Sequence, residues 1–190
     1  MNGILHWNDV VAYLGDGVSA HEQALSKATD ATHGLLACRF VPTDPAKFVS
    51  RKGLHAERDL VRSATWRHDI DQALSSWDPR GSAMLVLLML NRSPCGDCAQ
   101  ILANALHEFN DRYALTTERQ HFVLASLGYY HSHKPAVRGD SGSFKTFTTD
   151  KGLSTLTEAG WKLCTLEFGN GLTRRGQELH TYLSGLPRWG

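Results

Sequence analysis

Apolar residues along the chain form two patterns, short continuous runs and stripes with helical spacing. The run AMLVLLML at residues 83–90 is apolar throughout, which is typical of a strand buried on both faces. The segment CGDCAQILANALHEFNDRY at residues 95–113 instead places apolar residues three or four apart, which predicts an amphipathic helix. The chain is therefore expected to pass here from a buried strand directly into a helix.

The same patterns, with turn residues between them, divide the rest of the chain. Further strands are predicted at residues 33–42, 47–51, 121–130 and 161–169. Further helices are predicted at residues 4–15, 19–31, 54–66, 153–160 and 174–186. The polar stretch SSWDPRGS and the segment from His131 to Gly152 are predicted to be loops.

This order of elements predicts an α/β domain, because strands and helices alternate over most of its length. The long connection before the last strand allows a right-handed crossover, so the last two strands should be parallel. The only candidate boundary lies near residue 30. We expect residues 1–30 to form an N-terminal helical cap on a domain of residues 31–190.

Composition indicates an ordinary globular chain. Its 190 residues are 42% hydrophobic and 21% charged, with a net charge of +1, so any nucleic-acid surface must be a local patch. The first residues lack a basic segment followed by an apolar one, and no apolar run is long enough for a membrane span. We expect no membrane partner, and either a cytoplasmic protein or a toxin domain of a larger exported chain.

The four cysteines fall into two classes. Cys38 and Cys164 stand singly in apolar runs, as buried hydrophobic residues do, so a disulfide framework is not expected. Cys95 and Cys98 are separated by two residues at the start of the predicted helix, which directs both sulfurs toward one point. A helix N-terminus also favours the thiolate, the form that binds metals.

His55 and Glu57, in LHAERD, complete a catalytic pattern with the cysteine pair. His55, Cys95 and Cys98 offer three ligands for a tetrahedral Zn²⁺, and an open fourth position is typical of catalytic sites. Glu57 then serves to take a proton from the attacking water and to give one to the leaving nitrogen. H-x-E followed by P-C-x-x-C is a known signature of zinc nucleobase deaminases, and HAE with PCGDC matches every defined position.

Two other interpretations of the cysteine pair explain less of the sequence. A closed zinc ribbon would need a second pair of ligands, whereas the remaining cysteines are single. A thioredoxin-like redox pair suits a helix start, but it leaves HAE without a role.

Four segments in order, LHAERDLV, LLMLNRSPCGDCAQIL, FVLASLGYY and LSTLTEAGWKLCTLEF, resemble the cytidine deaminase-like superfamily. Within it they are similar to the AID/APOBEC-like polynucleotide cytosine deaminases and their bacterial relatives. The resemblance covers roughly residues 35–185. It implies a three-layer fold with a five-stranded mixed sheet, helices on both faces, and the two zinc-site helices side by side. It also implies zinc ligation by His55, Cys95 and Cys98 and proton transfer by Glu57.

The resemblance also indicates the substrate class and its contacts. Free-nucleoside deaminases return to an antiparallel last strand, whereas the polynucleotide branch inserts a helix and makes the last two strands parallel. Tyr129 and Tyr130 match the loop that reads the base 5′ of the target, and aromatic rings there would stack on bases. His33 matches the first substrate loop, and Ser93 matches the pocket residue before P-C. Arg92 stands where AID/APOBEC proteins have a pocket tryptophan, which puts the base selectivity in question.

A second departure lies between His55 and Cys95, where this chain is longer than is usual in that branch. The added residues lie in DIDQALSSWDPRGS and are expected to form an enlarged polar loop at the mouth of the site. These differences favour a divergent, bacterial relative, used as a toxin, for which an immunity protein would be the partner.

The function predicted from the sequence is zinc-dependent deamination of cytosine to uracil in nucleic acid, with single-stranded DNA as first choice and RNA or duplex DNA as further possibilities. One alternative is a deaminase of free cytidine or another small base. The other is a catalytically idle, zinc-stabilised module that binds nucleic acid or protein.

Overall fold

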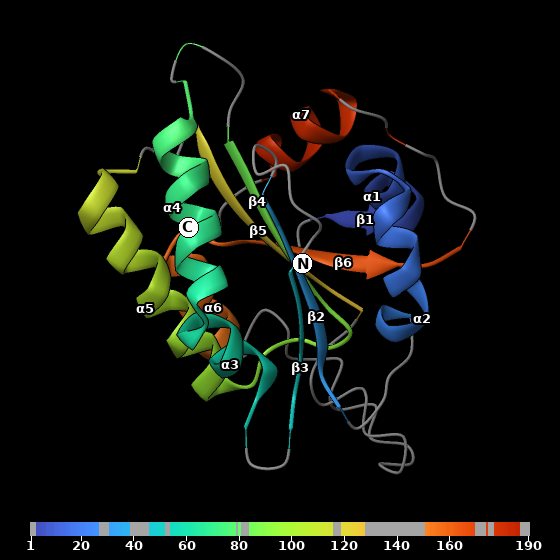
Figure 1. Ribbon diagram of the computed structural model, residues 1–190, viewed down its shortest axis with the longest axis horizontal. Helices are drawn as coiled ribbons and strands as arrows, with labels where there is room; N and C mark the ends of the chain where they lie inside the picture. The colour runs from blue at the N-terminus through green and yellow to red at the C-terminus, as the bar shows by residue number, and fades with distance from the viewer. Residues whose placement is uncertain are drawn as a thin grey trace.

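In the computed structural model, the chain forms a single mixed sheet with helices on both faces (Figure 1). The structure describes residues 3–26, 31–38, 46–51, 54–78, 80, 84–115, 119–127, 151–169, 174 and 177–186. The predicted α/β class and the three layers are confirmed. In the described part of the chain, no helix is long and apolar enough to span a membrane.

The sheet has six strands in the order β1-β6-β5-β4-β2-β3. Their bounds are β1 Ile4–His6, β2 His33–Cys38, β3 Ala46–Val49, β4 Met84–Leu90, β5 Gln120–Ser126 and β6 Lys162–Glu167. β2 runs antiparallel to both β3 and β4, whereas β4, β5, β6 and β1 are mutually parallel. The parallel pairing of β5 with β6, the last two strands along the chain, is as predicted.

The expectation of five strands is wrong, because the N-terminal segment contributes a sixth. A helix was predicted from residue 4, but Ile4–His6 forms β1 and pairs with β6, with Leu5 opposite Leu166. Helix α1 begins only at Trp7 and ends at Leu14. Leu5 is fully buried in the core cluster that β1 shares with α1 and α7 (Gln177–Gly185). Pairing with β6 and this packing therefore decide the conformation of residues 4–6.

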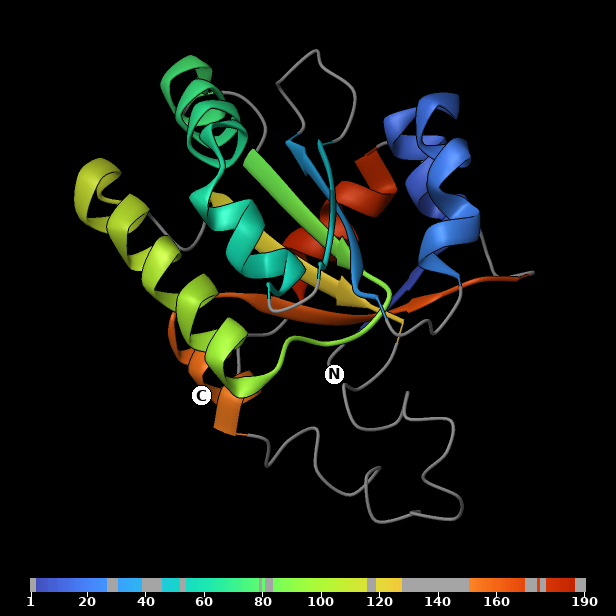
Figure 2. The same ribbon diagram turned by 60° about the horizontal axis from the view of Figure 1, so that its bottom comes forward.

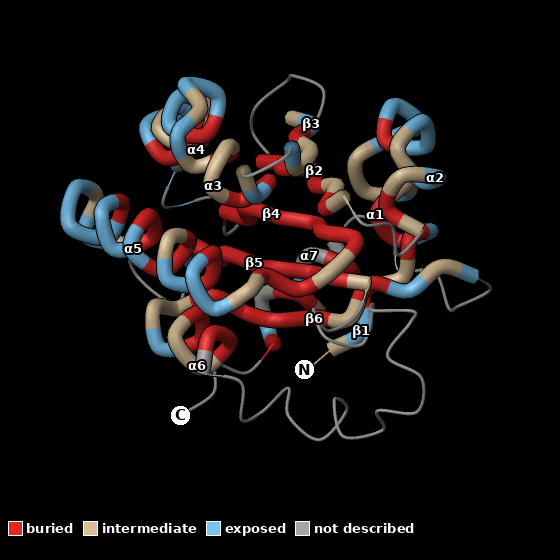
Figure 3. Tube along the Cα trace, turned by 90° about the horizontal axis from the view of Figure 1, so that it is seen from below, coloured by how far each residue is buried: buried red, intermediate tan, exposed pale blue. Residues whose placement is uncertain are grey.

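The helices form one layer on each face of the sheet (Figure 2). On one face lie α3 Ala56–Arg62, α4 Ala64–Ser76, α5 Gly96–Tyr113 and α6 Lys151–Glu158; on the other lie α1, α2 Glu22–Leu25 and α7 Gln177–Gly185, with the 3₁₀ turn η1 Asp16–His21 between α1 and α2. Alternate residues of the strands face the two layers, so Val86 and Leu88 join one core cluster while Leu87 and Met89 join the other. The central strands β4 and β5 are accordingly buried along their whole length, whereas the edge strands β1 and β3 are partly exposed, and the helices expose their outer sides (Figure 3).

Of the segment DIDQALSSWDPRGS, for which a polar loop was predicted, residues 69–76 form the second half of helix α4. Ser63 interrupts the predicted helix of residues 54–66 with an extended backbone, and its side chain accepts a hydrogen bond from the Trp66 N–H at 3.1 Å. Ser63 thereby caps α4, whose Trp66 and Ile70 are buried on the sheet. The polar surface of α4 is therefore the solvent side of a packed helix.

Candidate metal centre

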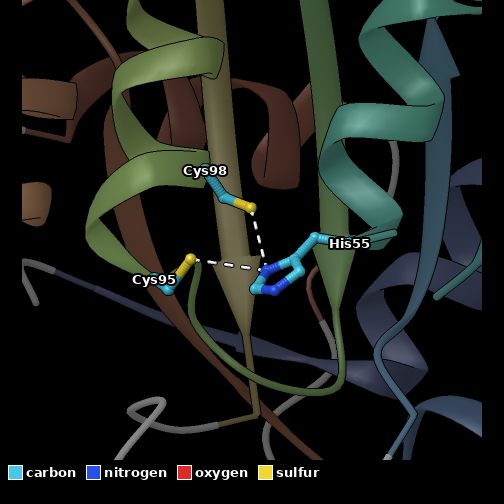
Figure 4. Close-up of side chains that lie close together, drawn as sticks. All are labelled: His55, Cys95 and Cys98. Atoms are coloured by element: carbon cyan, nitrogen blue, oxygen red, sulfur yellow. Dashed lines mark hydrogen bonds between the residues drawn. The ribbon is translucent and has the colours of Figure 1, made fainter. Parts of the chain in front are cut away.

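Two helices begin with side chains that face each other (Figure 4). His55 is the N-cap of α3 and Cys95 is the N-cap of α5, which leads out of the buried strand β4. N-cap side chains usually accept a hydrogen bond from the first turn of their helix, but neither of these does. Both are directed instead toward the gap between α3 and α5, where Cys98 also points.

The predicted ligands His55, Cys95 and Cys98 are brought together with spacings that fit zinc. The Nδ1 atom of His55 lies 3.4 Å from the Cys95 Sγ atom and 3.3 Å from the Cys98 Sγ atom. With Zn–S of about 2.3 Å and Zn–N of about 2.0 Å, tetrahedral geometry separates a sulfur from a nitrogen ligand by about 3.5 Å. The three ligand atoms all lie within 4.8 Å of one another, so one ion can reach all of them.

Burial differs among the three ligands, and the difference gives the centre an open side. Cys98 is buried, Cys95 is half-buried, and His55 is exposed. An ion held here would have protein on the side of Cys98 and solvent on the side of His55. Such an opening is typical of catalytic rather than structural metal sites.

The two thiols interact closely enough to share a proton. A hydrogen bond from Cys98 lowers the pKa of the Cys95 thiol to about 5, with a contribution from nearby His55. The same hydrogen bond and burial raise the pKa of the Cys98 thiol. The pair thus already holds one thiolate at neutral pH, which is the form that a metal ion requires.

Glu57 lies in the first turn of α3 and is buried, with 2% of its surface exposed. Burial is the main cause that raises the pKa of its carboxyl, and negative charge on Cys95 adds to this. Its Oε2 atom is buried and has no hydrogen-bond partner among the described residues. A buried carboxylate beside three metal ligands is well placed to exchange a proton with a bound molecule.

Three of the predicted substrate contacts lie near the end of β4. Ser93 is buried, and Arg92 and His33 are half-buried. His33 begins β2 next to the end of β4, since the neighbouring Gly34 pairs with Leu90. Tyr129 and Tyr130 lie outside the described residues, as does most of the predicted loop from His131. The substrate roles of all five residues stay predictions.

Asn91 is a residue that the sequence interpretation missed. It is fully buried at the end of β4, and its side chain hydrogen-bonds the backbone of the segment that leads into β2. A polar residue directly after an apolar strand and before PC was the available signal, because such a side chain needs buried partners.

The two remaining cysteines have the predicted structural role. Cys38 in β2 and Cys164 in β6 are buried and free, and burial raises the pKa of each thiol to about 12. They lie within the hydrophobic core clusters, as predicted from their apolar surroundings.

Comparisons with known proteins add little to this geometry. No protein-family model and no curated protein sequence matches the chain. A crystal structure of dCMP deaminase from the cyanophage S-TIM5 in apo form is 12% identical, with a TM-score of 0.35, and the match covers 77% of this chain and 91% of that one. The structure of the same enzyme in complex with dCMP and dUMP is 12% identical, with a TM-score of 0.33, and the match covers 80% of this chain and 90% of that one. TM-scores of this size do not indicate a shared function, so the residues of the site are the basis for a functional assignment.

Proposed function

We propose that the chain is a zinc-dependent hydrolytic deaminase that converts cytosine to uracil in nucleic acid, with single-stranded DNA as the preferred form. The observation that carries the proposal is the convergence of His55, Cys95 and Cys98 on one point, with the buried carboxylate of Glu57 close enough to interact with all three. A purely structural metal site has no use for a buried carboxyl oxygen without a partner among the described residues.

His55 Nδ1 and the two cysteine sulfurs would hold the zinc ion. When bound, zinc supplies the Lewis acidity that makes a water molecule a nucleophile near neutral pH. Glu57 accepts one proton from water as the oxygen bonds to C4 of the base, and it passes this proton to ring N3. It then accepts the second proton from the new C4 hydroxyl group and passes it to the departing amino group. The C4–N bond breaks, so cytosine and water give uracil and ammonia. The raised pKa of Glu57 favours this exchange, since its carboxyl holds a proton more readily than an exposed one.

Two observations support a substrate larger than a free nucleoside. β5 and β6 are parallel with α6 between them, whereas in the superfamily that the sequence resembles, compact free-nucleoside enzymes have an antiparallel last strand. Buried nitrogen atoms of His33 and Arg92 lack partners within the described part of the chain, so a ligand with several oxygen atoms could satisfy them.

The deciding experiment measures uracil formation by the zinc-loaded protein on five substrates. These are one cytosine-containing oligonucleotide as single-stranded DNA, as duplex DNA and as RNA, together with free cytidine and deoxycytidine monophosphate. The test variant is Glu57→Gln, and the matched control is Glu108→Gln on the exposed side of α5. We expect turnover of the single-stranded oligonucleotide, loss of at least about 1,000-fold in Glu57→Gln, and no change in Glu108→Gln.

Each other outcome points to a different function. Turnover of only cytidine or deoxycytidine monophosphate would assign a small-molecule deaminase. Full activity of Glu57→Gln would refute the proton-transfer role. A zinc-loaded protein that turns over none of the five substrates would overturn the proposal and favour a zinc-stabilised binding module.

A further inference from the structure

A buried asparagine links the start of β2 to the connection that carries Cys95. Asn91 follows β4 directly and has no exposed surface. A buried amide is costly unless its oxygen and nitrogen both find partners. Its hydrogen bonds therefore show which part of the chain it holds in place.

Those partners belong to residues 31–33, just before and at the start of β2. The Asn91 Oδ1 atom accepts a hydrogen bond from the His33 N–H at 2.8 Å, and the Nδ2 atom donates to the Ala31 carbonyl at 3.1 Å. The Asn91 backbone N–H also donates to the His33 carbonyl at 3.0 Å. One partner is a donor and the other an acceptor, so they fix the orientation of the side-chain amide.

A second contact holds the same segment from its other side. The Ser50 hydroxyl accepts a hydrogen bond from the Thr32 N–H at 2.8 Å, and the Ser50 N–H donates to the Thr32 carbonyl at 2.9 Å. Because Ser50 keeps the segment attached to β3, loss of the Asn91 side chain should loosen residues 31–33 without detaching them. The effect on a bound molecule should then exceed the effect on folding.

Two residues next to Asn91, His33 through a backbone hydrogen bond and Arg92 along the chain, have a side-chain nitrogen with no partner in the part of the chain that the structure describes. The His33 Nδ1 and Arg92 Nε atoms are buried without a hydrogen-bond partner among the described residues. A buried nitrogen left without a partner destabilises the folded chain, and a ligand that supplies the partner recovers this free energy on binding. The Arg92 Nε–H can only donate, so the ligand atom that meets it must be an acceptor, such as an oxygen.

The imidazole of His33 contributes hydrogen bonding rather than charge. Burial lowers the pKa of His33, and the positive charge of nearby Lys47 lowers it further. The ring is therefore neutral at neutral pH, and its Nδ1 atom can donate or accept according to its tautomer.

We propose that Asn91 is a positioning residue, which fixes residues 31–33 so that His33 and Arg92 present their buried nitrogens to the oxygen atoms of a bound cytosine nucleotide. This inference rests on the proposed function. It concerns how the same site binds the parts of the nucleotide other than the reacting atoms C4, N3 and the amino group. Asn91 itself touches no substrate and acts through His33.

The test is a double-mutant cycle with Asn91→Ser and His33→Ala, alone and together. The control is Asn104→Ser on α5, where an exposed asparagine accepts a hydrogen bond from Gln100. Two quantities are measured on the single-stranded oligonucleotide: kcat and KM for zinc-loaded protein, and the Kd of the same variants in the Glu57→Gln background by fluorescence anisotropy. Zinc content is measured for every variant.

We expect Asn91→Ser to lower kcat/KM about tenfold, mainly through KM, with unchanged zinc content. In the His33→Ala background the same change should cost less than about twofold, because its target is gone. Asn104→Ser should change neither quantity. If Asn91→Ser fails to fold, Asn91→Asp, which keeps an acceptor for the His33 N–H, takes its place in the cycle.

Three results would overturn the inference: additive effects of the two substitutions, equal effects of Asn91→Ser and Asn104→Ser, or loss of zinc in Asn91→Ser. Failure of the proposed function would look different. In that case wild-type protein would show no turnover, while the binding cycle in the Glu57→Gln background would still report coupling between Asn91 and His33. Absence of oligonucleotide binding in every background would overturn both.

Discussion

Removal of a single sulfur ligand should abolish the stabilisation of the fold by zinc. Cys98 is the most buried of the three ligands, and its Sγ atom lies 3.3 Å from His55 Nδ1. Cys98→Ala leaves His55 and Cys95, which cannot complete the three-ligand site. Because the three ligand atoms are already close to tetrahedral spacing, binding needs little rearrangement of the folded chain.

The size of the effect follows from mass action. At free zinc about 100-fold above Kd, binding only to the folded state stabilises it by about 2.7 kcal/mol. For a chain of this length, 1 kcal/mol moves Tm by about 2–4 °C, so zinc should raise Tm by about 5–10 °C. Cys98→Ala also deletes one buried atom, but that loss lowers Tm equally with and without zinc.

Thermal unfolding with chelator and with zinc, followed by circular dichroism, measures this difference. Cys38→Ala is the matched control, because it deletes the same buried atom in a residue of β2 outside the ligand set. Wild-type protein and Cys38→Ala should both show the zinc-dependent shift, and Cys98→Ala should show none. A full shift in Cys98→Ala would refute its role as a ligand, and no shift in wild-type protein would refute the metal centre.

Three further predictions follow from particular contacts. Gly34→Ala should lose about 1–3 kcal/mol of stability in urea unfolding, since a Cβ atom there would overlap the Phe48 ring. Arg174→Ala should cost about 1.5–3 kcal/mol in the same measurement, because it removes the ion pair with the fully buried Asp9 carboxylate, which then keeps only the hydrogen bond from the backbone N–H of residue 174 among the described residues. In chelator-treated protein at pH 7, iodoacetamide should alkylate Cys95 first, because its pKa of about 5 makes it a thiolate.

Each of these predictions has an internal control. Gly185→Ala should not destabilise the protein, since a Cβ atom there meets nothing within 4 Å; equal loss in both glycine variants would contradict the packing argument. Arg112→Ala breaks an exposed ion pair with Asp71 and should matter far less than Arg174→Ala. Cys164, with its pKa raised by burial to about 12, should stay unmodified, and its early labelling would contradict the assignment of the reactive thiol.

The metal centre was predictable from the sequence because its geometry is local to two helix starts. The spacing of Cys95 and Cys98 at the beginning of one helix, and of His55 and Glu57 at the beginning of another, directs each pair to one side. The buried strands β4 and β5 were likewise predictable, since every residue in each is buried and the runs are dominated by apolar residues. Both follow from short-range pattern and backbone geometry.

Long-range contacts decided what the sequence could not. Ile4–His6 carries no strand signal of its own and becomes β1 by pairing with β6. Residues 64–76 read as largely polar, yet they fold as α4 because Trp66 and Ile70 find a buried surface on the sheet. Asn91 gains its place from hydrogen bonds to Ala31 and His33, which are far from it in sequence.

The sequence by itself therefore determined the three residues that are positioned to bind a metal, the glutamate near them and the α/β class, because residue type and spacing carry that information within single elements. Only the tertiary structure decided the number of strands, the helix between the two motifs, and the hydrogen bonds that tie Asn91 to the start of β2. These features depend on the partners that segments meet after the chain has folded, and no local pattern encodes those partners.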